Sequence, residues 1–267
     1  MTFETLDYTA VWQGCLPLSR VEWHFDPNAR LDLSAFERRN VEQYWEGLKQ
    51  NQSWIEDLPL YRLLGFEDMN GGLKFELGLT GYKEYVGTNV SRPQWALANP
   101  NEKMANPLPI SVVAVTSDKK VPMQIRSVAA GGDRGKWHVT PSGNTHPPYS
   151  LEDAVLMELL EELAVNSEEI VGPILLTGVV VDKHITKHEL MLLLHLRPSW
   201  EDILSRSAID SWEYERLEPL GWDSDVVGDW LIRNERSCVP PGHAALMLGG
   251  RVQFGDVWMN NIVGALD

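Results

Sequence analysis

Three glutamates near the middle of the chain are spaced so that their carboxylates could act together on a positively charged partner. The segment 151–165 reads LEDAVLMELLEELAV. Because a helix turns about 100° per residue, Glu158, Glu161 and Glu162 fall within an arc of roughly 100°. Leucines occupy the opposing face, at positions 156, 159, 160 and 163. One face of this predicted helix would therefore enter the core, while the other face gathers carboxylates.

This arrangement has two interpretations. Glu158 and Glu162 form a like-charge i,i+4 pair, which destabilises a helix by about 0.2–0.5 kcal/mol unless something neutralises it. A hard divalent cation would do so, because magnesium prefers carboxylate and other oxygen ligands. The commoner meaning of a glutamate run is a solvated acidic face on an amphipathic helix. Spacing alone favours the acidic face, so the decision depends on the neighbouring residues.

The residues before and along this helix resemble a known motif. Counted from Gly143, the chain resembles the Nudix box, G-x5-E-x7-R-E-U-x-E-E-x-G-U, in which U is aliphatic. The chain departs from the box at three positions: Tyr149 replaces the first glutamate, Met157 the arginine and Ala164 the late glycine. The residues in register with the motif are Gly143, Glu158, Leu159, Glu161, Glu162 and Val165.

The resemblance implies a fold and a metal site. It implies an α/β fold, a Nudix-type α/β/α sandwich with a mixed sheet, preceded by a small amino-terminal α+β module. Glu158, Glu161 and Glu162 would bind Mg²⁺, or Mn²⁺, and the turn at Gly143 would bring backbone close to a diphosphate. The replacements Tyr149 and Met157 leave open the number of metal ions and the positioning of the catalytic glutamate.

A second resemblance lies upstream of the box. Residues 77–89 read LGLTGYKEYVGTN, which looks like the signature LGLTxYxxxxGTN of a divergent Nudix branch, the UDP-glucose and UDP-galactose diphosphatases. Segments 44–49, 125–127 and 212–214 resemble the same branch. The implied reaction is attack of a metal-activated water on the diphosphate of a UDP-sugar, giving UMP and a sugar 1-phosphate.

The resemblance also implies individual roles. Glu213 would complete the metal shell or act as a base beside the three helix glutamates, so the implied catalytic residues are Glu158, Glu161, Glu162 and Glu213. For Tyr82 and Lys83, contact with substrate is about as well supported as an ordinary half-buried tyrosine and a solvated lysine. The implied substrate-binding residues are Tyr82, Lys83, Thr88, Asn89, Arg126 and Gly143.

Other polar residues are better explained by structure than by chemistry. His184 and His188 flank a predicted hairpin turn and are expected to be exposed, which makes Glu189 a weaker ligand candidate. His146 precedes a Pro-Pro pair in the loop over the predicted site, and we favour a structural role for it. The chain has 11 tryptophans, which are expected in packing, although one ring could stack on a base.

The elements that must position these residues follow from hydrophobic periodicity. Residues 33–49 read as a helix and residues 73–79 as a strand. The Asn- and Pro-rich segment 96–109 reads as a connector, which divides the chain into a module at 1–105 and a hydrolase domain at 106–267. Downstream we predict strands at Ile110–Val115 and 121–125 joined as a hairpin, a strand at Trp137–Val139, a helix from Ser150 to Val165, paired strands at 174–181 and 190–196, and helices at 224–233 and 244–248.

Composition limits the possible partners. The 267 residues carry a formal net charge of −15, which argues against binding to nucleic acid or to an anionic membrane surface. A phosphorylated small molecule, here a nucleotide sugar, remains compatible if a metal or a few basic side chains supply local positive charge. Cys15 and Cys238 share no metal-type spacing, and no apolar run approaches the ~20 residues that cross a bilayer, so a cytoplasmic location is expected. The oligomeric state stays open.

Three hypotheses follow from the sequence. The first is a UDP-sugar diphosphatase. The second is a nonhydrolytic nucleotide-sugar binding protein, suggested by Tyr149, Met157 and Ala164 in the box. The third is a Nudix hydrolase of another nucleoside diphosphate derivative such as ADP-ribose.

Overall fold

A five-stranded mixed sheet forms the centre of the molecule. The computed structural model describes residues 6–52, 54–93, 104–127 and 132–266. The sheet has the order β1-β9-β10-β5-β8, in which β10 and β5 are parallel and the other neighbours are antiparallel. Its strands are β1 (Tyr8–Pro17), β9 (Ile170–Asp182), β10 (Lys187–Leu196), β5 (Ile110–Val115) and β8 (Ser142–Gly143).

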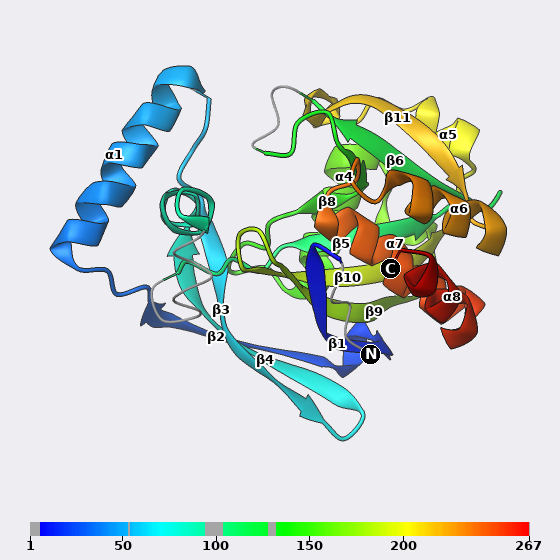
Figure 1. Cartoon of the computed structure of the whole chain (residues 1–267), viewed down its shortest axis with the longest axis horizontal. Helices are drawn as coiled ribbons and strands as arrows, with labels where there is room; N and C mark the ends of the chain where they lie inside the picture. Colours follow the sequence, from blue (N-terminus) through cyan, green and yellow to red (C-terminus); the bar gives the residue numbers. More distant parts are fainter. Residues whose placement is uncertain (1–5, 53, 94–103, 128–131, 267) are drawn as a thin grey trace.

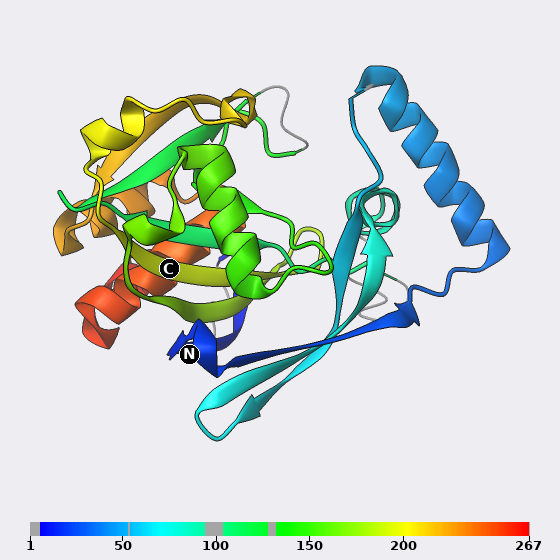
Figure 2. The same cartoon turned by 180° about the vertical axis from the view of Figure 1, so that it is seen from behind.

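Helices cover both faces of this sheet. Every residue of β5 is buried, and successive side chains of a strand point to opposite faces. Val113 and Val115 pack in one core cluster with α7 (Pro240–Phe254), whereas Val112 and Ala114 pack in another with α4 (Leu151–Leu163). Figure 2 shows α4 in front of the sheet. The helices α6 (Ser224–Asn234) and α8 (Asp256–Leu266) pack beside α7. The predicted α/β class, a helix–sheet–helix sandwich with a mixed sheet, is confirmed.

A second sheet contains the strands β11 (Tyr214–Gly221), β6 (Lys120–Arg126) and β7 (Trp137–Val139), in that order. The predicted hairpin between β5 and β6 is wrong, although both strands exist. The backbone N–H of Thr116 donates to the carbonyl of Lys120 at 2.8 Å and closes the turn. β10 pairs along the whole of β5, and β8 pairs with Ile110 and Ser111 on the other edge. Beyond the turn, β6 pairs with β11 and β7 and not with β5.

A third sheet, together with α1, forms an arm beside the sandwich. It has the order β2-β4-β3, with β2 (Val21–Arg30), β4 (Gly72–Gly81) and β3 (Pro59–Met69). Figure 1 shows α1 (Ala35–Asn51) standing away from the sandwich, at the far side of this sheet. Ser34 caps α1 through a capping box with Glu37. The chain then passes through the short helix α2 (Tyr82–Tyr85) and a π-helical turn (Val86–Val90).

The sheets cross the predicted division at residue 105. The strand β1 belongs to the first segment, yet it pairs with β9 in the central sheet. Its Tyr8 is 1% exposed, and the Tyr8 hydroxyl lies 3.1 Å from Nδ1 of His243 in α7. The division into 1–105 and 106–267 therefore stays a proposal about sequence segments. Most of the predicted connector, residues 96–103, lies outside the described residues, whereas Met104 and Ala105 are buried.

Most of the other predicted elements are confirmed within a few residues. The sequence patterns did not reveal β1, β2, β3, β11, α8 or the short helix α5 (Trp200–Leu204). In the part of the chain that the structure describes, no helix is long and apolar enough to cross a membrane. The confirmed elements are α1, β4, β5, β6, β7, α4, β9, β10, α6 and α7.

Candidate functional site

The helix α4 carries the three glutamates of the predicted site. It begins after Ser150, whose hydroxyl accepts from the backbone N–H of Asp153 at 3.1 Å in a capping box. Leu151, Val155 and Leu159 of α4 are buried in the core cluster beneath the central sheet. This packing fixes the rotation of the helix about its axis and so fixes the direction of each carboxylate.

Glu162 points into the protein. It is 1% exposed, although the amphipathic pattern placed it with Glu158 and Glu161 on a carboxylate face. One carboxylate oxygen accepts from the backbone N–H of Ser142 at 2.9 Å, and the other accepts from the Thr140 hydroxyl and from Nε2 of Gln124 at 3.4 Å. Burial raises the pKa of Glu162 to about 8, and the charge of Glu213 adds to the effect.

Glu158 lies directly against Gly143. A Cβ built on Gly143 would fall on the Glu158 carboxylate, so only glycine lets the helix carboxylate approach the backbone of β8 this closely. The pKa of Glu158 is raised well above its usual value by burial and by the charges of Glu162 and Glu213. Gly143 and the Glu158 carboxylate, both in register with the motif, therefore lie side by side.

Glu161 extends from the same helix into a cavity. Its pKa is raised by burial and by the charge of Asp210, whose backbone N–H donates to the Glu161 carbonyl at 2.9 Å. Among the described residues, no group donates a hydrogen bond to the side-chain carboxylate of Glu158, Glu161 or Glu213. These three carboxylates therefore have no hydrogen-bond donor among the described residues to offset the repulsion between their charges.

The donor chemistry of these residues fits a hard divalent cation. Unpaired carboxylate oxygens are the ligands that Mg²⁺ prefers, and a cation would remove the repulsion that raises the pKa values of Glu158 and Glu161. Within the ranges that the structure describes, no three His, Cys, Asp or Glu side chains converge as a preformed metal-binding group. Glu162 accepts hydrogen bonds from its three buried donors and is not among the residues that line the cavity beside Glu161.

Arg126 and Glu213 lie on neighbouring segments, at the end of β6 and just before β11. Arg126 ends β6, and the backbone N–H of the next residue, Ser127, donates to the Glu213 carbonyl at 2.9 Å. Burial raises the pKa of Tyr82 to about 12. The charges of Tyr85 and Glu213 raise this pKa as well, whereas the charge of Arg126 lowers it. Glu213 has its own pKa raised by burial, which the charge of Arg126 opposes. The charges of Arg126 and Glu213 thus act on a tyrosine of the amino-terminal arm.

The other predicted substrate residues of the arm are engaged elsewhere. Nζ of Lys83 lies 3.0 Å from the Glu42 carboxylate on α1, at the surface. Thr88 is fully buried, and its hydroxyl donates to the Glu84 carbonyl at 2.6 Å and accepts from the backbone of residue 105. Asn89 is fully buried as well, and its amide donates to the carbonyl of residue 185 at 3.1 Å. These contacts make Lys83, Thr88 and Asn89 structural in this conformation.

The glycines of the segment 77–89 explain why it resembles a fixed signature. A Cβ on Gly78 would overlap the backbone carbonyl of Ala29 in β2. A Cβ on Gly87 would meet Val41 of α1 at 2.7 Å. Close packing of strand against strand and of helix against turn therefore requires glycine at both positions.

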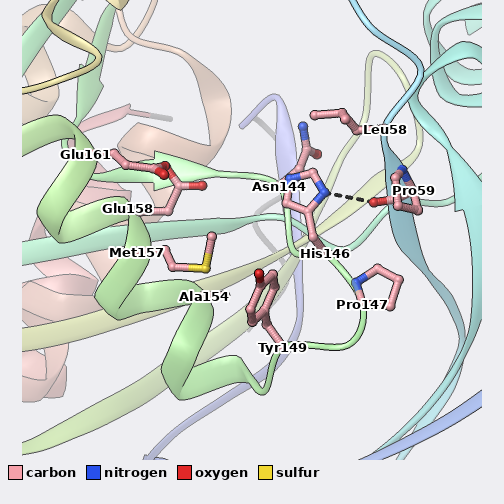
Figure 3. A pocket seen from close by; sticks show the side chains of 10 residues that line it. All are labelled: Leu58, Pro59, Asn144, His146, Pro147, Tyr149, Ala154, Met157, Glu158 and Glu161. Carbon is pink, nitrogen blue, oxygen red and sulfur yellow. Dashed lines mark hydrogen bonds between the residues drawn. The ribbon is translucent and has the colours of Figure 1, made fainter.

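A cavity of about 340 Å³ opens beside α4. Figure 3 shows Glu158 and Glu161 extending into it from the helix, opposite Leu58 and Pro59 of the arm. The sequence analysis did not identify this cavity, although Tyr149 and Met157 stand at charged positions of the box. It is lined by Leu58, Pro59, Asn144, His146, Pro147, Tyr149, Ala154, Met157, Glu158 and Glu161.

A buried ion pair lies next to the β8 strand. Nζ of Lys187 is 3.0 Å from the Glu189 carboxylate, and the Ser111 hydroxyl donates to the same carboxylate. Ser111 pairs with Ser142 across β5 and β8, so this pair supports the strand that donates to Glu162. Glu189, the weaker ligand candidate, is thus already partnered.

The two histidines of the β9–β10 turn differ from each other. His184 is exposed as expected, with Nε2 3.2 Å from the Asp7 carboxylate. His188 is partly buried, and burial lowers its pKa to about 4. The expectation that His188 is exposed is therefore wrong.

Comparison with known proteins gives structural similarity of limited extent. No protein-family model matches the chain, and no curated protein matches it in sequence. The protein DR0079 of Deinococcus radiodurans shares 13% identity over 53% of this chain and 82% of its own, with a TM-score of 0.41. A MutT protein of Methanosarcina mazei Go1 shares 14% over 55% of this chain and 94% of its own, with a TM-score of 0.39. The NUDIX domain of Shewanella oneidensis NrtR, solved with ADP ribose, shares 19% over 60% of this chain and 97% of its own, with a TM-score of 0.37.

Proposed function

We propose that this chain is a metal-dependent hydrolase of the Nudix type that cleaves the diphosphate of a nucleotide sugar. The substrate class is UDP-glucose or UDP-galactose, and the products are UMP and a sugar 1-phosphate. The observation that carries the proposal is the Glu158 carboxylate, which lies against Gly143, is repelled by Glu162 and Glu213, and has no hydrogen-bond donor among the described residues. The resemblance to the box and to the signature segment 77–89 supports the same reaction. A cytoplasmic location is part of the proposal.

The residues divide the chemistry among them. Glu158 and Glu161 would hold a Mg²⁺ or Mn²⁺ ion, with Glu162 behind them. When bound, the ion would lower the pKa of an attacking water and neutralise charge on the phosphoryl oxygens. Arg126 supplies a fixed positive charge for a phosphate, since its Nε–H donates to the carbonyl of residue 132 at 2.9 Å. Glu213, whose pKa is raised, is suited to accept the proton of the water near neutral pH.

The experiment measures release of UMP from UDP-glucose with magnesium and with chelator. Wild type should release UMP only with the metal, and Glu158→Gln should lose on the order of 100-fold in kcat, as expected when a group acts in the transition state. Glu152→Gln is the matched control, because Glu152 is an exposed glutamate in the first turn of the same helix. Equal rates in Glu158→Gln and Glu152→Gln would contradict the assignment.

The same assay decides between the remaining hypotheses. Tyr149 and Met157 stand where the box has charged residues, which favours a binding protein without turnover as the second candidate. Metal-dependent binding of UDP-glucose without UMP release would support that candidate. Faster cleavage of ADP-ribose than of UDP-glucose would keep the hydrolase and change its substrate.

A further inference from the structure

The cavity beside α4 has one charged end and otherwise mostly apolar walls. Glu158 and Glu161 stand at the charged end, and Leu58, Pro147 and Ala154 belong to the apolar remainder. Its volume of about 340 Å³ lies in the range of small-molecule sites, which are lined mainly by apolar groups with a few placed polar ones. The cavity therefore has the form of a subsite next to the proposed diphosphate site.

Two of the apolar wall residues occupy positions that are charged in the box. Tyr149 stands at the position of the first glutamate and Met157 at the position of the arginine, and both line this cavity. Tyr149 is 43% exposed, so a large part of its side chain is available to a ligand. Where the motif would place two charges, this chain presents an aromatic ring and a polarisable thioether.

Besides the two glutamates, the cavity has few polar side chains. Among the described residues the Asn144 amide has no hydrogen-bond partner, and it carries both donor and acceptor capacity. His146 Nδ1 lies 2.8 Å from the Pro59 carbonyl and donates its proton to it, which fixes the orientation of the ring.

The loop that carries these groups is fixed to the arm. The Tyr61 hydroxyl donates to the Tyr149 carbonyl at 2.9 Å, and the Tyr61 N–H donates to the carbonyl of residue 145 at 3.1 Å. With the contact between His146 and Pro59, three hydrogen bonds hold the loop against β3. The cavity is therefore preorganised by the arm.

We propose that this cavity binds the heterocyclic base of the nucleotide substrate, with the ring against Tyr149 and Met157 and its polar edge read by Asn144. The inference rests on the proposed function, which places the diphosphate at Glu158 and Glu161. A planar base suits apolar walls, because its faces need no hydrogen bonds and its edge presents donors and acceptors together. A sugar presents hydroxyls around its ring, and burying them without partners is unfavourable. Base recognition is thus assigned to this loop and not to Lys83, Thr88 or Asn89.

The test uses ligands that lack the diphosphate bond. Dissociation constants of UMP and of glucose 1-phosphate are measured in chelator for wild type, Tyr149→Ala, Asn144→Ala and Tyr44→Ala. Tyr149→Ala should weaken UMP binding by about 10-fold or more, the size expected for loss of base stacking, and leave glucose 1-phosphate unchanged. Asn144→Ala should reduce the preference between UMP and AMP. Tyr44→Ala, which removes an exposed tyrosine of α1, should behave as wild type.

Each other outcome has a definite meaning. Unchanged UMP affinity in Tyr149→Ala, or no UMP binding by wild type, would overturn the proposal. A loss of glucose 1-phosphate binding alone would assign the cavity to the sugar and overturn it as well. Tyr149→Phe keeps the ring and should bind UMP as wild type does, which separates stacking from misfolding. If UMP binding depends on Tyr149 but no substrate is cleaved, the base site stands and the hydrolase proposal is wrong.

Discussion

Glu162 is a buried carboxylate whose charged form is opposed by its surroundings. It lies inside the protein with three hydrogen-bond donors, yet burial and the charge of Glu213 raise its pKa to about 8. The backbone N–H of Ser142 and the Thr140 hydroxyl lower the pKa, so they offset part of that effect. At neutral pH the unloaded protein therefore retains a proton here that an unfolded chain would release.

This difference predicts a pH dependence of stability. A glutamate with an ordinary pKa of 4.5 releases its proton on unfolding, whereas the folded protein holds it until about pH 8. The free energy of unfolding should therefore fall as the pH rises from about 5 to 8, since each unit of pKa difference corresponds to about 1.4 kcal/mol. In chelator, Glu162→Gln should lose a clear part of this slope. Urea denaturation at several pH values measures it.

Glu152→Gln serves as the control, because the exposed Glu152 should leave the slope as in wild type. Identical slopes in wild type and Glu162→Gln would mean that Glu162 is ionised in the folded protein throughout this range. The other carboxylates with raised pKa values, Glu158 above all, should still make the free energy of unfolding of the variant fall as the pH rises.

At the scale of elements, the end of α4 shows how the chain accommodates its third departure from the box. Ala164 has φ 52° and ψ 40°, a left-handed conformation that favours glycine, and the box has glycine at this position. The guanidinium of Arg206 donates to the Ala164 carbonyl at 2.8 Å and also binds the Glu169 carboxylate. This contact satisfies a carbonyl at the helix terminus while the backbone strain remains.

Ala164→Gly should relieve that strain. We expect it to raise the free energy of unfolding by about 0.5–1 kcal/mol, because the left-handed conformation costs alanine more than glycine. Thermal or urea denaturation would measure the gain. Gly47→Ala is the reverse substitution at a helical position. Gly47 is exposed in α1 with open space around it, so alanine should raise the free energy of unfolding there by a similar amount. A lower free energy of unfolding in Ala164→Gly than in wild type would contradict the claim that Ala164 is strained.

The elements that could be predicted from the sequence are those that depend on residues close together in the chain. Ser150 caps α4 through a residue three positions away, so the start of that helix was predictable. The predicted leucine face is right only in part, because Leu159 and Leu163 are buried whereas Leu160 is 44% exposed. The partner of Lys83 is Glu42, on another helix, and neither spacing nor composition reveals such a contact. The same holds for Glu162, because an amphipathic pattern does not show that a second sheet covers one flank of the carboxylate face. The cavity was missed for this reason as well, since its walls come from the arm and from α4.

At the scale of the whole molecule, the arm and the sandwich are joined at several places. The strand β1 lies in the central sheet, and the next strand, β2, lies in the arm. Trp54, after α1, packs edge to face on Trp212, which precedes Glu213, with ring centroids 5.3 Å apart. Tyr61 adds a hydrogen bond from the arm to the loop of the candidate site, and Leu58 and Pro59 line its cavity. The site is therefore built by both parts.

A fragment of residues 106–267 should not fold as a soluble monomer. Without β1 it would expose one edge of β9 and the apolar residues that Leu6 and Tyr8 cover, which favours aggregation. Co-expression with a fragment of residues 1–105 should restore solubility, because that fragment supplies the missing strand. Size-exclusion chromatography of both preparations gives the result. A monomeric, cooperatively folded 106–267 fragment would contradict this account.

The position of β1 also has a consequence in time. Tyr8 pairs with Asp182, so the partner strand leaves the ribosome long after β1 has been made. At about 5–20 residues per second, β1 waits for roughly ten to thirty seconds before β9 is available. During that interval Leu6 and Tyr8, which are buried at the end, are exposed on a nascent chain. Slow synthesis of residues 18–182 would lengthen this exposure, so the yield of folded protein should depend on translation speed within that segment.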